Sequence, residues 1–176
     1  MALTVVWFVV LVVAVGLERL CELVVSTRNL RWSRERSGFE AGAGHYPFMV
    51  VLHTGLLVGA LIEVLLAHRQ FHPLLGWTMF GLVLAGQALR WWCIRVLGHQ
   101  WNTRIVVVPG AERVTGGPYR WLSHPNYVAV VVEGFALPLV RSAWITALVF
   151  TVLNAALLTV RIRAENLALR QLTAAA

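Results

Sequence analysis

The chain has 176 residues, of which 59% are hydrophobic and only 13% are charged, and its formal net charge is +7 at pH 7. This composition excludes an ordinary soluble domain, in which about 25% of residues are charged. Every basic residue is Arg and every acidic residue is Glu, which excludes lysine Schiff-base chemistry and Asp-based metal or phosphoryl sites. In so apolar a chain, the positive charge indicates contact with anionic lipid headgroups and not with nucleic acid.

The first apolar segment covers residues 3–25 and carries Glu18, Arg19 and Glu22 near its end. No basic residue precedes it, and no small-residue cleavage site follows it. These features predict a retained transmembrane helix and not a cleaved signal peptide.

Four further apolar segments follow. Residues 46–67 make ~33 Å of helix, enough to cross a bilayer, and the next segment starts after Pro73 and continues to about Leu97. The apolar stretch 127–160 is divided by Pro138 and Arg141 into a short segment and a full one, which we predict to form a helical hairpin. The sequence therefore predicts an all-α polytopic membrane protein with about five transmembrane helices, in one domain over residues 1–176.

Arginines are concentrated in alternate connections between these segments. The regions with many arginines contain Arg28, Arg31, Arg34 and Arg36, then Arg104, Arg113 and Arg120, and in the tail Arg161, Arg163 and Arg170. The opposite connections contain only Arg69 and Arg141. Because positive loops face the cytoplasm, this bias predicts an outside N-terminus and a cytoplasmic C-terminus.

The cysteines and histidines of the chain indicate neither a disulfide nor a metal site. Cys21 and Cys93 lie in apolar helical stretches and are interpreted as buried free thiols. The histidines are too scattered for a metal site.

Glu133 lies roughly 10 Å into the fourth segment by helical rise. An acid at that depth usually has a partner or faces a cavity, so it is either a structural pair with His53 or a residue of a substrate pocket.

The longest polar stretch between segments, residues 98–126, is the candidate site. Its Val-rich run at 105–108 fits either a short strand or an apolar lid. Gly116, Gly117 and Pro118 form a turn signal at which the backbone can approach a ligand closely. Pro125 suits the first turn of a helix, and the free backbone N–H groups at such a helix start could hold a carboxylate.

Two motifs in this half of the chain resemble a known family. Residues 117–127 read GPYRWLSHPNY, and residues 161–166 read RIRAEN. Together they resemble the signature of the isoprenylcysteine carboxyl methyltransferase family, which also includes membrane phospholipid N-methyltransferases and bacterial lipid O-methyltransferases. The resemblance covers residues 98–169, and it implies a donor-binding half over about 98–170. One departure is Asn166, which occupies the second position of the family's terminal acidic pair.

The resemblance implies S-adenosylmethionine as the methyl donor and assigns roles to individual residues. The residues that would bind the donor are Arg104, Val114, Gly117, Tyr119, His124, Pro125, Asn126, Tyr127 and Glu165. Arg161 would face the methyl acceptor and act in catalysis together with Glu165, and Glu133 is the further candidate for contact with the acceptor. Structural alternatives remain open at this stage: Arg161 as a membrane anchor, Glu165 as its helix partner, His124 as a turn residue, and the two tyrosines as interfacial anchors.

The expected function is thus methyl transfer to a carboxylate or hydroxyl of a lipophilic acceptor, either prenylcysteine-like or a long-chain phenol or pyrone. The exclusive use of Arg suggests a high-GC genome and hence a bacterial lipid acceptor and a bacterial plasma-membrane enzyme. The arginine bias of the connections places its active site on the cytoplasmic face. The alternatives are a nicotinamide-dependent membrane reductase of sterol type and a non-catalytic membrane interaction protein.

Overall fold

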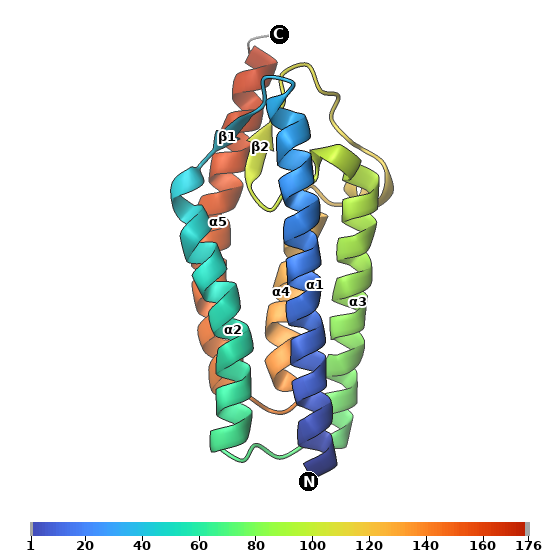
Figure 1. The fold of residues 1–176 in the computed structure, drawn as a ribbon, viewed down its shortest axis with the longest axis vertical. Coiled ribbons are helices and arrows are strands. Elements are labelled where there is room, and N and C mark those ends of the chain that lie inside the picture. The colour runs from blue at the N-terminus through green and yellow to red at the C-terminus, as the bar shows by residue number, and fades with distance from the viewer. Residues whose placement is uncertain (1, 175–176) are drawn as a thin grey trace.

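The computed structural model describes residues 2–174, with the side chains of residues 4–170. Within that range the chain forms an elongated bundle whose N-terminus and C-terminus lie at opposite ends (Figure 1). The five α-helices of the described chain are α1 (Ala2–Arg34), α2 (Tyr46–Leu66), α3 (Pro73–Leu97), α4 (Pro125–Leu139) and α5 (Trp144–Ala174). The predicted all-α class is confirmed, and α4 and α5 pack against each other as the predicted hairpin.

Three segments are long and apolar enough to cross a membrane, namely residues 43–66, 73–100 and 144–170. The fourth predicted segment, α4, has 15 residues and a length of ~22 Å. The chain is therefore a multi-pass integral membrane protein. Its orientation and the full number of crossings stay predictions from the charge pattern.

The first helix is longer than the sequence pattern indicated. It was expected to end near residue 25, but α1 continues to Arg34, which gives it a length of ~50 Å. Arg28, Arg31 and Arg34 therefore lie exposed on its last turns and not in a connecting loop. Arginines are favourable at this position because the C-terminal end of a helix carries partial negative charge.

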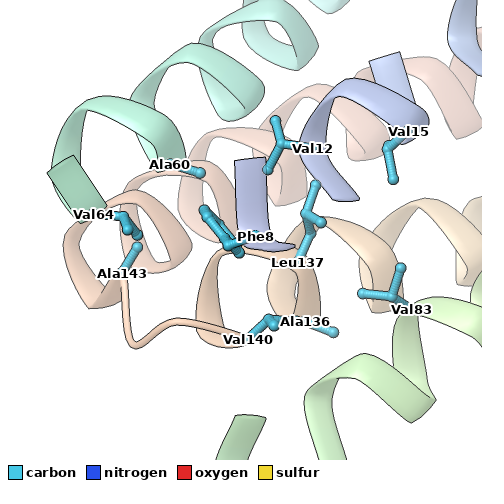
Figure 2. Close-up of a cluster of buried hydrophobic side chains, with 10 residues drawn as sticks. All are labelled: Phe8, Val12, Val15, Ala60, Val64, Val83, Ala136, Leu137, Val140 and Ala143. Atoms are coloured by element: carbon cyan, nitrogen blue, oxygen red, sulfur yellow. The ribbon is translucent and has the colours of Figure 1, made fainter. Parts of the chain in front are cut away.

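The apolar core lies in the half of the bundle that contains the N-terminus. Phe8 is fully buried against side chains of the neighbouring helices (Figure 2). The cluster comprises Phe8, Val12, Val15, Ala60, Val64, Val83, Ala136, Leu137, Val140 and Ala143. This core joins α1, α2, α3 and the α4–α5 hairpin at one end, and it leaves the other end to polar contacts.

Prolines and one carboxylate fix where the helices begin. Proline stands in the first turn of α2, α3 and α4, where its missing N–H costs no hydrogen bond. Glu63 of α2 accepts hydrogen bonds from the backbone N–H of Thr146, at 2.7 Å, and of Ile145, at 3.2 Å. It also forms an ion pair with Arg69 at 2.8 Å. A carboxylate is favourable at a helix N-terminus, so Glu63 locks the start of α5 onto α2.

A two-stranded antiparallel sheet closes the opposite end of the bundle (Figure 1). Strand β1 (Phe39–Ala41) pairs with β2 (Ile105–Val107), with Phe39 opposite Val107 and Ala41 opposite Ile105. The Val-rich run is therefore a strand. Since β1 follows α1 and β2 follows α3, the sheet ties together the two long connections that carry most of the polar residues.

The two cysteines differ in environment. Cys93 is buried and Cys21 is exposed, and both are free thiols. The prediction of free thiols is confirmed, whereas the predicted burial of Cys21 is wrong. Cys21 lies on α1 next to the exposed Leu20, on a face that no neighbouring helix covers.

Candidate active site

The residues of the two sequence motifs meet around one hydroxyl group. The guanidinium of Arg161 on α5 donates from Nε to the Tyr127 hydroxyl at 2.9 Å. That hydroxyl, on the first turn of α4, donates in turn to the carboxylate of Glu165. Arg161 and Glu165 are one helical turn apart, and Tyr127 bridges them from the neighbouring helix.

His124 joins the same group from the loop that precedes α4. Its ring stacks on the ring of Tyr127, with centroids 5.3 Å apart and planes at 16°. Its Nδ1 lies 3.7 Å from a carboxylate oxygen of Glu165. The structure thus brings together His124, Tyr127, Arg161 and Glu165, although they are spread over 42 positions of the sequence.

The connection after α3 holds Arg161 in place. Arg161 donates from Nη2 to the carbonyl oxygen of Thr103 at 2.5 Å. Thr103 is in turn held by Ser26 of α1, whose hydroxyl accepts from the Thr103 backbone N–H at 3.0 Å. Asn29 of α1 donates to the carbonyl of Trp101 at 2.7 Å. The extra length of α1 therefore fixes the loop that orients the arginine, which is only 5% exposed.

The glycine turn packs against α3. Gly117 opens the 3-10 helix Gly117–Arg120 with φ of +55°, and a Cβ at this position would lie 2.6 Å from Val96. Tyr119, in the same turn, lies against the Cys93 thiol, and burial followed by the neighbouring thiol raises the pKa of its phenol above the ordinary range. An ordinary tyrosine is already neutral at physiological pH, and the raised pKa of Tyr119 keeps its phenol neutral at alkaline pH as well.

Two other residues of the predicted donor site, Arg104 and Val114, and the departure at Asn166 lie away from the Tyr127 hydroxyl. Arg104 forms an ion pair with Glu40 of β1 at 3.0 Å and stacks over the Tyr46 ring at 4.2 Å, so it lies at the edge of the sheet and not on the Tyr127 hydroxyl. Val114 is half-buried in the loop, and Asn166 is exposed. The loss of the second acidic residue at position 166 therefore removes no buried contact.

A cavity of about 180 Å³ begins at this group and extends into the bundle between α1, α2, α4 and α5. Arg161, Tyr127 and Asn126 line its loop end, and most of the exposed lining surface is apolar. His124 and Glu165 are absent from the lining. Two lining residues, Leu23 of α1 and Val50 of α2, are 40% and 44% exposed. They are therefore the candidates for a place where the cavity opens.

The far wall of the cavity is a buried cluster of charges that the sequence did not predict. Glu133 of α4 pairs with Arg90 of α3 at 2.5 Å and also with Arg19 of α1. Glu22 pairs with Arg19 at 2.7 Å and with Arg90 at 3.3 Å. The two acids and two bases balance each other's charge. The signal available in the sequence was the occurrence of charged residues inside apolar helices.

The predicted pair of Glu133 with His53 is wrong. The carboxylate of Glu133 is taken by two arginines, and the ring of His53 is placed elsewhere in the cavity wall, where it packs edge-to-face on Phe150 with centroids 5.4 Å apart. Arginine is a better partner than histidine for a buried carboxylate because its guanidinium offers several N–H donors in one plane. Glu133 does line the cavity, as its second interpretation required.

Polar atoms inside the site have capacity for a ligand. Within the part of the chain whose side chains are described, Asn126 Oδ1, Asn154 Oδ1 and Trp101 Nε1 are buried without a hydrogen-bond partner. All three residues line the cavity. Since an unpaired buried polar group costs about 1–3 kcal/mol, these atoms favour a bound molecule that offers both hydrogen-bond donors and acceptors.

Comparison with known proteins gives two matches. The profile of the isoprenylcysteine carboxyl methyltransferase family matches residues 79–171, more than half of the chain and the part that contains both motifs. The chain is also 37% identical over 166 residues to the uncharacterized protein YpbQ of Bacillus subtilis (strain 168), a match that covers 94% of this chain and 96% of that protein. A Bacillus relative is consistent with the predicted bacterial origin.

Proposed function

Because this chain belongs to the isoprenylcysteine carboxyl methyltransferase family, we propose that it transfers a methyl group from S-adenosylmethionine to a carboxylate or hydroxyl of a lipophilic acceptor. Membership gives the general activity, a membrane methyltransferase. The donor, the acceptor class and the residue roles are the proposal. The observation that carries it is the hydrogen-bonded chain from Arg161 through Tyr127 to Glu165, which connects a cavity inside the bundle to the polar loop outside it.

The cavity suits a lipophilic acceptor. Most of its exposed lining surface is apolar, and the lining includes the exposed Leu23 of α1 and Val50 of α2. We expect an acyl or prenyl chain to leave the bundle beside these two residues and to remain in lipid. Arg161 is the cation at the loop end of the cavity, whereas Arg19 and Arg90 of the far wall are paired with carboxylates. A guanidinium pairs well with a carboxylate or an ionised hydroxyl because it presents several N–H donors in a fixed plane. We assign Arg161 to orient the reacting oxygen and Glu133 to the wall that contacts the acceptor.

The loop side suits S-adenosylmethionine. This donor supplies a methyl group on a positively charged sulfur, and it carries hydroxyl, amine and adenine groups that need polar partners. Glu165 offers a carboxylate, His124 and Tyr127 offer stacked aromatic faces favourable to a cation, and Asn126 has an unpaired amide oxygen. Asn102, in the preceding loop, has both of its side-chain polar atoms buried without a partner among the described residues. These groups fit the donor's chemistry.

The remaining residues of the proposed donor site hold the loop in its conformation. Gly117 allows the turn to lie on α3, Tyr119 anchors it beside Cys93, and Pro125 begins α4 directly after His124. Arg104, at the edge of the sheet, and Val114, in the loop that follows β2, would close the site. Methyl transfer from a sulfonium to oxygen is a displacement along one line, for which positioning matters more than covalent catalysis.

We place the reaction at the cytoplasmic face of a bacterial plasma membrane. The arginine-rich connections and the proposed donor site lie at the same end of the bundle, the end with the sheet (Figure 1). Cytoplasmic loops carry the excess of arginine in membrane proteins, and S-adenosylmethionine is a water-soluble cytoplasmic metabolite. The donor would thus arrive from water while the acceptor arrives from the bilayer.

Donor binding by the purified protein tests this proposal. In detergent, the wild type should bind S-adenosylmethionine saturably, and Glu165→Gln should weaken binding by about tenfold or more, the value of a lost charged hydrogen bond. Glu112→Gln is the matched control, because Glu112 is exposed in the same region and its loss should leave affinity unchanged. Absence of saturable binding by the wild type, or binding of a nicotinamide cofactor in its place, would contradict the proposal.

A further inference from the structure

His53 lies in the wall of the cavity with no role so far assigned to it. It belongs to α2, one helical turn after Met49, and its side chain lines the cavity together with Arg161 and Tyr127. It is only partly exposed, and the charge cluster of Glu133 does not use it. A histidine in the wall of a cavity that also contains the proposed acceptor-binding arginine is a candidate for proton transfer.

The hydrogen bond of the ring fixes its protonation pattern. Nδ1 of His53 lies 2.8 Å from the carbonyl oxygen of Met49. A carbonyl oxygen can only accept, so Nδ1 carries the hydrogen and donates. In a neutral imidazole the other nitrogen then has a free lone pair. The edge-to-face contact with Phe150, at an interplanar angle of 87°, holds the ring in this orientation. In the neutral form of His53, Nε2 is therefore the unprotonated nitrogen of a ring held in a fixed orientation.

The ring shares the cavity with Arg161, to which we assign the acceptor oxygen. The sulfur of Met49 lies 2.6 Å from Nη1 of Arg161, and Met49 precedes His53 by one helical turn of α2. Met49, His53 and Arg161 all line the cavity, so an acceptor oxygen held by Arg161 would enter the same space as the imidazole.

The other histidine near the site is less suited to this task. His124 stacks on the outer face of Tyr127 and lies beside Glu165, and it does not line the cavity. A proton on an acceptor inside the cavity is therefore accessible to His53, and His124 remains available to the donor.

We propose that Nε2 of His53 accepts the proton when a hydroxyl acceptor is methylated in this cavity. This inference rests on the proposed function. A carboxylate is already ionised at neutral pH and needs no base, whereas a phenol has a pKa near 10 and gains from one.

The step balances as follows. The acceptor O–H bond breaks and its proton moves to Nε2, while an oxygen lone pair forms the new O–CH₃ bond. The S–CH₃ bond breaks and its electron pair stays on sulfur. The products are a methyl ether, a neutral thioether and an imidazolium, which returns its proton to solvent water after the ether leaves.

Kinetics with two acceptors tests the assignment. The His53→Gln variant retains an amide that can donate to Met49 but cannot accept a proton. For a long-chain phenol, kcat should fall about 100-fold, the typical contribution of a general base. For the nitro-substituted analogue, which is already ionised at the assay pH, kcat should change by less than about twofold because no base is needed. His72→Gln, an exposed position before α3, should match the wild type with both acceptors.

Equal losses of kcat with both acceptors would overturn the inference, since they would indicate a packing role. So would methylation of carboxylates alone. In that case S-adenosylmethionine binding would persist in the wild type and the proposed function would stand, whereas lack of donor binding would contradict both proposals.

A second readout needs no donor and no turnover. In protein labelled with ¹⁵N at histidine, the His53→Gln spectrum identifies the His53 signals. The wild type should show an unprotonated Nε2 whose resonance shifts toward the protonated form when the long-chain phenol is added and stays in place with its methyl ether. An Nε2 signal that is protonated from the start, or that ignores the phenol, would overturn the inference.

Discussion

Arg161 donates from Nε to the hydroxyl of Tyr127 at 2.9 Å, and the same hydroxyl donates to Glu165. Arg161 lines the cavity, whereas Glu165 lies outside it. Tyr127 therefore stands at the boundary between the proposed acceptor and donor sides, and its hydroxyl sets the positions of both charged groups.

Removal of that hydroxyl should affect both substrates. In Tyr127→Phe, Arg161 Nε and Glu165 each lose a charge-assisted hydrogen bond, worth about 1.5–3 kcal/mol. We expect donor affinity to fall by about 10- to 150-fold, the equivalent of that energy, as measured by equilibrium binding of S-adenosylmethionine. Arg163→Gln, an exposed change on the same helix, is the control. A Tyr127→Phe protein with wild-type donor affinity would show that the hydroxyl is not part of the site.

The glycine turn offers a matched pair of variants. Gly117 and Gly110 both have positive φ, of +55° and +74°, but a Cβ at Gly117 would meet Val96 whereas a Cβ at Gly110 would meet nothing within 4 Å. Both Ala variants should lose about 1 kcal/mol of stability from backbone strain. Only Gly117→Ala should also displace the loop and weaken donor binding. Equal donor affinity in the two variants would contradict this account of the turn.

The buried charge cluster should behave as a unit. Glu133→Leu leaves Arg19 and Arg90 with one carboxylate, Glu22, and should cost about 3–5 kcal/mol, as expected when one partner of a buried ion pair is removed. The double variant Glu133→Leu with Arg90→Met keeps the neutral pair of Arg19 and Glu22, so thermal unfolding in detergent should show it more stable than the single variant. Glu35→Gln, at an exposed pair of 3.7 Å, should change little. A double variant less stable than Glu133→Leu would contradict the charge balance.

The buried phenol of Tyr119 should make the stability of the folded protein depend on pH in the alkaline range. Burial and the neighbouring Cys93 raise the pKa of its phenol in the folded protein, so its contribution to stability is full below the ordinary tyrosine pKa of about 10 and is lost as pH rises above it. Between about pH 9 and pH 11, the Tyr119→Phe protein should therefore lose less stability than the wild type. Parallel loss in the two proteins would place the alkaline transition elsewhere.

Much of this arrangement was predictable from local signals. The apolar lengths and the prolines at 47, 73 and 125 fixed the starts of α2, α3 and α4, because proline is tolerated in the first turn. The two motifs predicted that His124, Tyr127, Arg161 and Glu165 would converge, and their side chains do meet.

The failures concern contacts between helices. The pairing of Glu133 with Arg90, and not with His53, depends on how α1, α3 and α4 are rotated about their axes, which periodicity does not fix when helices are apolar on most faces. Arg104 pairs with Glu40 only because the sheet register brings β1 and β2 together. The end of α1 was predicted at the end of the apolar run, near residue 25. The helix continues through the polar residues that follow, because no Gly or Pro interrupts the chain before Gly38.

Transfer of a labelled methyl group tests the central claim most directly. The purified protein in lipid nanodiscs is given S-adenosylmethionine with a labelled methyl group and, in separate reactions, a long-chain phenol and a prenylcysteine. We expect label in a lipid-extractable product that is absent with Arg161→Gln. The product should be stable to base, as an ether is, if His53 serves a hydroxyl acceptor. Saturable donor binding without any labelled lipid from either acceptor, or equal labelling by Arg161→Gln, would contradict it.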